Sequence, residues 1–347
     1  MEFARRIIMN YSEIIEAART QVGPICKACP VCNGLACKNH IPGPGSKGSG
    51  TVFARNYSAW QEYFVNMDTI CENRDADTRF DFFGNTFEIP VFAAPIGAMK
   101  LHYGEKYDDH QYNDILVRSC AEAGIAAWVG DGVDDTMLPD AISTIKKYGG
   151  RGVPTIKPWN RDKVLGKLEC ANEAGVMAAA MDVDAAGLPF LKNYGSDAGS
   201  KTVAELSEIT ANAKMPFFVK GIMTVKGAEK AVEAGAKGIV VSNHGGRVLD
   251  GCPATADVLP EIADAVKGKL MILVDGGIRT GLDVFKAIAL GADAVLIGRP
   301  IVTMIYGGGS EGIAVYVNKL KAELKDTMSM CGAHSLSEIS RDMIYGF

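Results

Sequence analysis

The sequence predicts an α/β protein, a closed (β/α)8 barrel of the TIM type that follows an N-terminal extension. Eight short apolar runs alternate with amphipathic stretches from about residue 90 onward, which is the pattern of a parallel barrel. Glycine closes several amphipathic stretches, as expected where a helix turns into a strand. The fingerprint G-x-G-x-x-G, which an open dinucleotide-binding sheet requires, follows no early strand. We assign residues 1–87 to the extension and residues 88–347 to the barrel.

The predicted strands are apolar runs bounded by glycine or charge, which is typical of strands buried on both faces. They lie at 91–96, 125–130, 153–157, 176–183, 216–220, 238–242, 271–275 and 294–298. The predicted helices lie between them, at 107–123, 134–147, 161–174, 203–213, 225–234, 254–266 and 281–290. Functional side chains are expected where the strands end, because barrels carry their active sites at that end.

The segments outside the barrel repeat are predicted from their glycine and proline content. An amphipathic helix is expected over Tyr11–Thr20. Proline and glycine exclude regular structure from residues 38–50, and we predict a flexible segment that folds over the mouth of the barrel. Gly307–Gly309 are expected to break the chain before a long terminal helix, Gly312–Met330.

Composition bounds the class of protein. The 347 residues are 48% hydrophobic and 22% charged, with a formal net charge of −5, as in soluble globular proteins. The negative charge argues against a nucleic-acid partner, which usually needs a basic face. The sequence has no apolar run of membrane-spanning length, and Met1–Arg6 lack the apolar core of a secretion signal. We expect a cytoplasmic enzyme that acts on a small molecule, without membrane or nucleic-acid partners.

The segment Ser242–Gly251 directly follows the apolar run Gly238–Val241 and contains both His244 and Arg247. These two residues therefore lie where a buried strand becomes a loop. Imidazole titrates near neutrality, and the nearby guanidinium is a fixed positive charge. The pair predicts removal of a proton from an anionic substrate.

Two glycine-rich segments end the last two predicted strands, Asp275–Arg279 and Gly298–Pro300. Glycine lets backbone N–H groups approach a phosphate closely, and arginine supplies a bidentate charge. Barrels often hold a phosphate at this position, and Pro300 suits the first turn of a helix whose N-terminus points at the same anion. The alternative, two ordinary turns with surface arginines, does not account for the paired placement.

Lys220 ends the predicted strand 216–220. Burying an ammonium group without a partner is costly, so we expect Lys220 to face an anion. That anion is either a ligand or a carboxylate in a structural ion pair.

Several segments resemble the FMN-dependent 2-hydroxy-acid oxidase and dehydrogenase family, which includes glycolate oxidase and lactate oxidase. They are PFFVKGI, GIVVSNHGGRVLDGCPAT, VDGGIRTGLDVFKAIALGADAVLIGRP and LKDTMSMCGAHSLSEIS within residues 216–341, and FEIPVFAAPIGAM and HYGE in the more weakly matching 50–184. The resemblance implies FMN bound across the carboxyl ends of a barrel, a small anionic substrate and a homo-oligomer, often a tetramer.

The resemblance also implies roles for individual residues. His244 is the base, Asp184 steadies it, and Lys220 stabilises charge on the reduced flavin. Arg247 holds the substrate carboxylate. The remaining flavin-binding residues are Pro95, Gly97, Ser242, Asp275, Gly276, Gly277, Arg279, Gly298 and Arg299. His102 lies outside the acid–base pair and is expected to be incidental.

The substrate side departs from the family pattern. Ile41 and Lys157 stand where the family has tyrosines, and no arginine follows Asp184 at the usual place. Asp182 occupies a position that is usually threonine. Lys157 is therefore expected either to replace the missing cation as a substrate ligand or to pair with Asp182 or Asp184.

Four of the nine cysteines form the run Cys26-x2-Cys29-x2-Cys32-x4-Cys37, which the family normally lacks. Four thiolates so close in sequence can converge on one metal site, and the spacing nearly repeats the ferredoxin run C-x2-C-x2-C-x3-C. Three interpretations stay open: an iron–sulfur cluster or zinc, redox-active thiols, and no cofactor. Structural disulfides are not expected in a chain without an export signal.

The leading prediction is an FMN-dependent oxidoreductase that converts an anionic 2-hydroxy acid, such as lactate or glycolate, to the 2-oxo acid. One alternative is an FMN-dependent isomerase like type 2 isopentenyl diphosphate isomerase. Another is a flavin redox relay that docks a partner through the cysteine segment, although a relay needs no general base such as His244.

Overall fold

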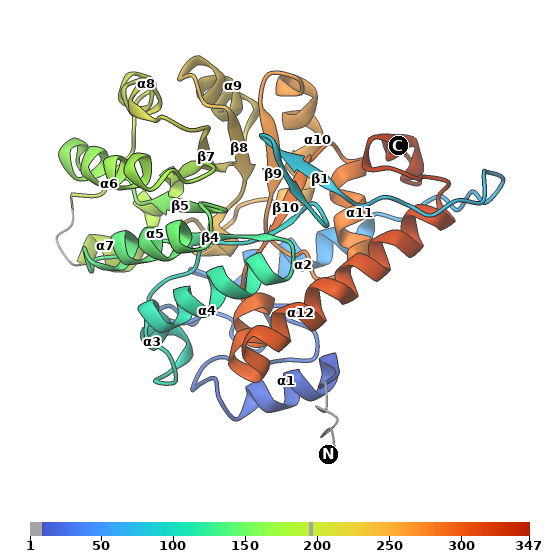
Figure 1. The fold of residues 1–347 in the computed structure, drawn as a ribbon, viewed down its shortest axis with the longest axis horizontal. Coiled ribbons are helices and arrows are strands. Elements are labelled where there is room, and N and C mark those ends of the chain that lie inside the picture. The colour runs from blue at the N-terminus through green and yellow to red at the C-terminus, as the bar shows by residue number, and fades with distance from the viewer. Residues whose placement is uncertain (1–8, 194–196) are drawn as a thin grey trace.

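The computed structural model describes residues 9–193 and 197–347. Eight parallel strands close into a barrel in the order β10-β3-β4-β5-β6-β7-β8-β9, with helices around them (Figure 1). The predicted (β/α)8 fold is therefore confirmed. The strands are β3 (Val91–Ala93), β4 (Ala126–Gly130), β5 (Gly152–Ile156), β6 (Ala179–Asp182), β7 (Phe217–Ile222), β8 (Gly238–Val241), β9 (Met271–Val274) and β10 (Ala294–Ile297).

Successive residues of each barrel strand pack on opposite sides of the barrel wall. Phe92, Trp128 and Phe218 fill the interior together with small residues such as Ala180. Their neighbours along the strands pack under the surrounding helices. Because both faces are apolar, the strands appear in the sequence as continuous rather than alternating hydrophobic runs.

A hairpin closes the amino end of the barrel. It is formed by β1 (Phe80–Phe82) and β2 (Asn85–Phe87), which pair antiparallel. Phe82 stacks on Phe218 with ring centroids 5.5 Å apart. The hairpin therefore seals the apolar interior and leaves the carboxyl end for polar side chains.

All seven helices predicted within the barrel repeat are present, with ends within three residues of the predicted ends. Capping side chains begin several of them, for example Asp108, Thr202 and Thr280. They are α4 (Asp109–Glu122), α5 (Met137–Lys147), α6 (Arg161–Ala174), α8 (Val203–Asn212), α9 (Val225–Glu233), α10 (Thr255–Val266) and α11 (Gly281–Ala289). Two short helices, α3 (Met99–Tyr103) and α7 (Pro189–Asn193), follow β3 and β6.

The predicted break before the terminal helix is confirmed. α12 spans Arg299 to Met330, but its backbone leaves the helical conformation at Gly309, which has φ 55° and ψ −134°. Two helical segments therefore meet at a sharp bend, and the second contains the predicted Gly312–Met330. Helix α1 (Tyr11–Arg19) packs against this bend (Figure 1). A Cβ atom on Gly307 would lie 2.1 Å from the carbonyl oxygen of Ile14, so glycine permits this close approach.

Helix α2 (Thr51–Glu62) was not predicted. It begins after Gly50 without a side-chain cap, so the usual start signal is missing. Its buried residues include Phe53, Asn56 and Trp60. Tertiary packing against the barrel therefore stabilises a helix that its sequence only weakly favours.

The predicted segment 38–50 does lie over the mouth of the barrel. The backbone N–H of Lys47 donates to the carbonyl of Gly246 at 2.8 Å, and that of Ser49 donates to Asp250 at 2.7 Å. The segment consists of turns, as its proline and glycine content predicts. These bonds join it to the loop that carries His244.

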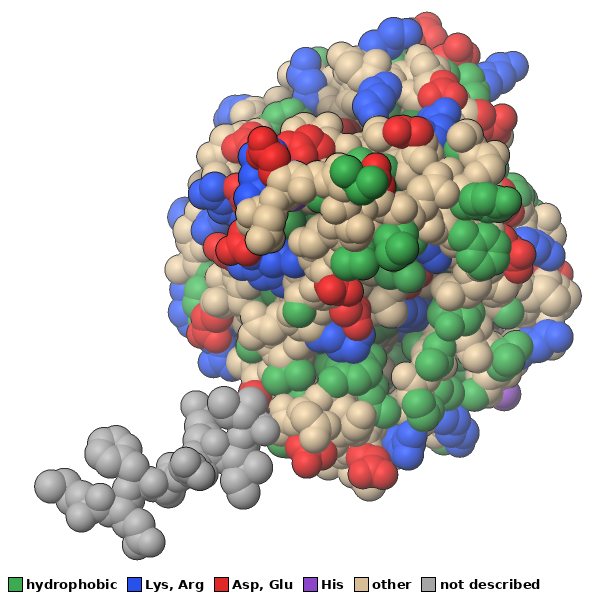
Figure 2. Space-filling model, turned by 90° about the vertical axis from the view of Figure 1, so that its right-hand side faces the viewer, with side chains coloured by type: hydrophobic (Ala, Val, Ile, Leu, Met, Phe, Trp, Pro, Cys, Tyr) green, Lys and Arg blue, Asp and Glu red, His purple; other side chains and the backbone are tan. Residues whose placement is uncertain are grey.

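Charges of both signs are mixed on the surface. Acidic and basic side chains are interspersed on the face shown in Figure 2. Exposed ion pairs such as Arg341–Asp264 join the terminal segment to the barrel, although such pairs contribute little to stability. In the two described ranges, no helix combines the length and apolar composition needed to cross a membrane.

Candidate functional site

A cavity of about 410 Å³ opens at the carboxyl end of the barrel. Loops after seven of the eight strands line it, together with Pro44 of the extension. The predicted site residues that line it are Pro95, Gly97, Lys157, Lys220, His244, Arg247, Asp275, Gly276, Gly277, Arg279, Gly298 and Arg299. Asp184 and Ser242 do not line the cavity, but they contact His244 and Lys220, which do. The four predicted cysteines lie around a separate cavity.

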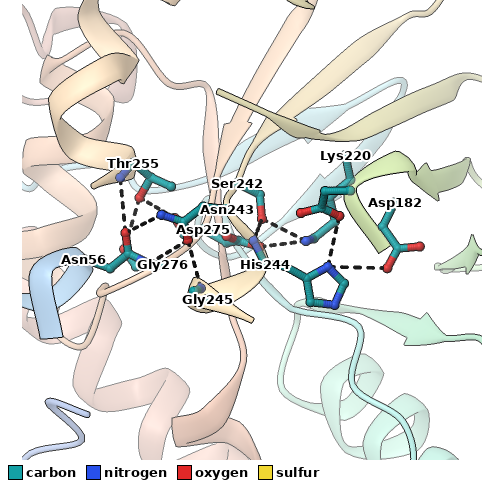
Figure 3. Close-up of polar contacts among 12 residues, drawn as sticks. Asn56, Asp182, Lys220, Ser242, Asn243, His244, Gly245, Thr255, Asp275 and Gly276 are labelled. Atoms are coloured by element: carbon teal, nitrogen blue, oxygen red, sulfur yellow. Dashed lines mark hydrogen bonds and ion pairs between the residues drawn. The ribbon is translucent and has the colours of Figure 1, made fainter. Parts of the chain in front are cut away.

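His244 is held in one orientation by a carboxylate. Its Nδ1 lies 2.9 Å from Asp184 and 3.9 Å from Asp182, and Figure 3 shows the contact with Asp182. The backbone of His244 has φ 55°, in the left-handed region. The backbone N–H of His244 donates to Ser242 Oγ at 3.1 Å. Since Nδ1 is occupied by Asp184, Nε2 is the nitrogen available to a ligand.

The surroundings keep the imidazole neutral. Burial, followed by the charges of Lys220 and Lys157, lowers the pKa of His244 well below its ordinary value. Burial also raises the pKa of Asp184, although Lys220 and Lys157 oppose this shift. At neutral pH His244 is therefore a neutral base.

Lys220 forms an ion pair with a carboxylate in the cavity wall. Its Nζ lies 3.1 Å from Asp275 Oδ2 and donates to Ser242 Oγ at 2.9 Å. Burial by itself would lower the pKa of Lys220, but Asp275, Asp184 and Asp182 raise it above its ordinary value. Lys220 is therefore a fixed positive charge.

Lys157 pairs with Asp182, the second of the two predicted alternatives. Nζ lies 2.6 Å from Asp182 Oδ2, and both side chains are more than nine-tenths buried. Lys157 also lines the cavity. The pair therefore places two opposite charges where the sequence resemblance leads one to expect a tyrosine and a threonine.

Arg247 is anchored to the extension and to His102. Its Nη1 donates to the carbonyls of Gly43 and Gly45, and its Nη2 lies 3.3 Å from His102 Nε2. Burial, followed by the charge of Arg299, lowers the pKa of Arg247 to about 10, so it is cationic at neutral pH. Burial, then Arg247, lowers the pKa of His102 to about 3. His102 thus belongs to the wall of the site, where the sequence had suggested an incidental residue.

The two arginines predicted to bind phosphate lie in the same wall of the cavity. Arg279 Nε donates to the carbonyl of Cys32 at 2.8 Å. Arg299 Nη2 donates to the carbonyl of Gly245 at 2.9 Å, and its guanidinium stacks on the ring of Phe53 at 3.6 Å. These contacts orient both side chains beside the glycine turns.

The residues fit the FMN that the sequence resemblance implies. Asp275 Oδ1 is buried and has no hydrogen-bond partner within the described chain, while its other oxygen pairs with Lys220. A buried acceptor without a partner on a cavity wall can accept a hydrogen bond from a hydroxyl group of a ligand. The arginines and backbone N–H groups near Gly277 supply the charge and close approach that a phosphate needs.

Two parts of the site were missed by sequence reasoning. Asp131, just after β4, accepts hydrogen bonds from Trp159 Nε1 at 2.6 Å and from the Lys157 N–H at 3.1 Å; its place at a strand end was a usable signal. Asn56 and Asn243 form a reciprocal amide pair at 2.7 and 2.8 Å, shown in Figure 3. No sequence signal marks Asn56, because its helix was not predicted.

Gly277→Ala is expected to destabilise the fold by more than Gly268→Ala. Both glycines have positive φ, 88° and 80°, a conformation that costs other residues about 1–2 kcal/mol. A Cβ on Gly277 would lie 1.9 Å from the Asn56 carbonyl oxygen, whereas nothing lies within 4 Å of one on Gly268. Thermal unfolding of the two variants measures the difference. Equal losses of stability in the two variants would show that α2 shifts freely and that the close contact between Gly277 and Asn56 is unimportant.

Comparison with known proteins agrees with this geometry. The family model described as FMN-dependent dehydrogenase matches residues 44–194 and 190–346. The 4-hydroxymandelate oxidase of Amycolatopsis orientalis is 31% identical over 336 residues, covering 86% of this chain and 90% of that protein. The 2-hydroxyacid oxidase of Dictyostelium discoideum is 47% identical over 146 residues, which are 42% of this chain and 38% of that protein. Several curated relatives are matched in this way over about two fifths of their length.

Solved structures of mandelate oxidases resemble this chain over nearly its whole length. A mandelate oxidase determined with (S)-2-phenylpropionate has a TM-score of 0.78 and 29% sequence identity. The alignment covers 96% of this chain and 97% of that one. The match of the family model to both halves of the chain and the agreement of the barrel show that this protein belongs to the FMN-dependent dehydrogenase family.

Proposed function

We propose that the protein oxidises a 2-hydroxy acid to the 2-oxo acid, with FMN as its cofactor. The observation that carries this proposal is a neutral imidazole, His244, fixed by Asp184 in the cavity that also presents Arg247 and Lys220. The reaction removes two electrons and two protons from the substrate. This reaction requires a base, a cation that binds the carboxylate, and a fixed positive charge beside the electron acceptor.

Each residue has a defined part in this proposal. Arg247 binds the substrate carboxylate through a guanidinium that is already oriented. His244 accepts a proton at Nε2, and Asp184 stabilises the imidazolium that results. Lys220 provides positive charge without reorganisation. FMN, when bound, takes up the two electrons, and Asp275, Gly276, Gly277, Arg279, Gly298 and Arg299 hold it, with Pro95 and Gly97 beside the ring and Ser242 supporting Lys220.

The substrate is proposed to carry an apolar side chain. Leu101, Leu188 and Phe190 line the cavity, and the chain resembles proteins named 4-hydroxymandelate oxidase and mandelate oxidase. Lys157 is neutralised by Asp182, which leaves Arg247 as the cation for the carboxylate. A cytoplasmic location and a homotetramer stay predictions from the sequence and its family resemblance.

The test is anaerobic mixing of the FMN-loaded protein with glycolate, lactate and mandelate. The flavin absorbance is expected to bleach, and Arg247→Met is expected to weaken substrate binding by about 10- to 100-fold, the worth of one hydrogen bond to a charged group. Arg161→Met, which removes an exposed arginine, is the matched control. If no hydroxy acid bleaches the flavin, the proposal fails in favour of an isomerase or a redox relay.

Substrate-dependent flavin reduction is expected to persist below pH 6.5. His244 acts when neutral, and its pKa lies well below the ordinary value of 6.5. Its activity as a base is therefore complete above that lowered pKa and is lost only as the pH falls through it. The pH dependence of the second-order rate constant for anaerobic flavin reduction, measured by stopped flow, tests this. An acid limb centred at or above pH 6.5 would contradict the neutral, desolvated imidazole.

A further inference from the structure

The four clustered cysteines line one small cavity of their own. Its volume is about 20 Å³, which is far less than an organic cofactor needs. Its wall is formed by parts of the extension, with one side made by the barrel. The lining residues that matter here are Cys26, Cys29, Cys32, Cys37, Tyr103 and Arg299.

The cysteine segment is held in shape by the rest of the protein. Its backbone lacks regular secondary structure in residues 24–37. The Arg19 Nε donates to the carbonyl of Ala28 at 3.3 Å, and Arg279 Nε donates to that of Cys32 at 2.8 Å. Gly34, with φ 86°, packs so closely on Phe53 that a Cβ would lie 2.6 Å from its ring. The four thiols therefore share one cavity because two arginines and a packed glycine fix the chain around it.

The thiols are free and stand too far apart for a single metal ion. All four are unpaired cysteines. Within the described chain, one set of three potential ligands has its atoms within 4.8 Å of one another, namely Asp182, Asp184 and His244. The thiols form no such set, whereas a zinc ion with bonds of about 2.3 Å would hold its sulfurs about 3.8 Å apart. The arrangement of the thiols therefore favours an occupant larger than one ion.

Positive charge surrounds the cavity. Arg299 lines it, and Arg19 and Arg279 donate to backbone carbonyls of the cysteine segment. Four thiolates around an inorganic core carry net negative charge, which nearby cations offset. The spacing of the cysteines, with two x2 gaps, is also close to that of thiolates that ligate a cubane.

We propose that Cys26, Cys29, Cys32 and Cys37 bind an iron–sulfur cluster of the cubane type, with four iron and four sulfide ions. This choice accounts for four free thiols, a cavity too small for an organic group and sulfur atoms too widely spaced for zinc. It does not depend on the proposed function.

The position of the cluster gives it a role that does rest on the proposed function. Pro44, Tyr103 and Arg299 line both the cluster cavity and the flavin cavity, so one layer of side chains separates them. Oxidation of one 2-hydroxy acid releases two electrons and two protons. A cluster held by these thiols would pass electrons one at a time to an external one-electron acceptor, so that two acceptor molecules would be reduced and the protons would pass to solvent.

Anaerobic purification, followed by iron and sulfide assays, tests the site. The wild-type protein, as isolated or after reconstitution with iron and sulfide, is expected to contain about four of each per chain. Cys32→Ser is expected to lose most of both, while Cys170→Ser, on α6 and outside the cavity, keeps them. FMN content and the circular dichroism spectrum check that the variants fold.

Three outcomes overturn the cluster. They are a wild-type protein that takes up no iron, one that holds about one zinc without sulfide, and full retention of iron and sulfide in Cys32→Ser. If Cys32→Ser does not fold, the wild-type iron and sulfide content still decides the proposal.

Electron paramagnetic resonance tests the role in electron transfer. Anaerobic addition of a substrate that bleaches the flavin is expected to produce the signal of a reduced cluster in the wild type. His244→Ala is expected to give that signal with dithionite and not with substrate. Bleaching without a cluster signal would overturn the electron-transfer role alone, whereas absence of bleaching would overturn the proposed function.

Discussion

Replacement of His244 by alanine is expected to slow substrate-dependent flavin reduction by about 10²- to 10⁴-fold, the range that a positioned general base contributes. Asp184 holds Nδ1 at 2.9 Å, so the ring is already oriented and loses little freedom when it accepts a proton. Anaerobic stopped-flow measurement of the bleaching rate at saturating substrate reports the effect. Because the proposed carboxylate ligand, Arg247, is unchanged in this variant, the substrate dissociation constant should change little.

His110→Ala is the matched control for this variant. His110 is also paired with a carboxylate, Asp140, at 2.7 Å, but it is exposed on α4. Its loss should leave the bleaching rate unchanged. A His244→Ala protein that loads FMN and still bleaches at the wild-type rate would show that another group takes the proton.

Asp131→Ala is expected to lower the free energy of unfolding by about 3–5 kcal/mol, the usual cost of removing one partner from a buried ion pair. Asp131 pairs with Lys167 at 2.8 Å, and the side chains are 0% and 7% exposed. The substitution leaves the Lys167 ammonium and the Trp159 N–H without this acceptor. Chemical or thermal unfolding of the FMN-free protein measures the loss.

Asp135→Ala provides the comparison on the same lysine. Asp135 lies 3.7 Å from Lys167 and also pairs with Lys163, but its own side chain is 68% exposed. Exposed pairs contribute about 0–1 kcal/mol, so this variant should lose far less stability. Equal losses for the two variants would mean that burial does not decide the strength of the Asp131 contact.

Much of the candidate site was predictable because its residues sit at strand ends. The histidine and arginine after β8 and the glycine–arginine segments after β9 and β10 all line the cavity. In a parallel barrel the carboxyl ends of the strands meet at one end, so side chains far apart in sequence come together. The partner of Lys157 could not be chosen from the sequence, because Asp182 and Asp184 are only two residues apart. The structure separates them, since Asp182 ends β6 and Asp184 lies in the 3-10 turn that follows.

The extension was less predictable for a different reason. Helix α2 lacks a side-chain cap and forms on packing contacts with residues such as Gly246, about 190 residues away. His102 and Arg247 are 145 residues apart and meet only after the barrel closes. Local sequence patterns carry no information on contacts between residues so far apart in the sequence.

The sequence alone predicted the eight strand–helix units, because these depend on local periodicity. By residue chemistry and position it also singled out His244, the arginines at the strand ends and the four clustered thiols. The tertiary structure decided which carboxylate pairs with which lysine and that His102 joins the wall of the site. It also placed the thiols around a small cavity beside the large one at the carboxyl end of the barrel. Those outcomes depend on the burial of charges and on contacts between distant segments, and both arise only when the chain is packed.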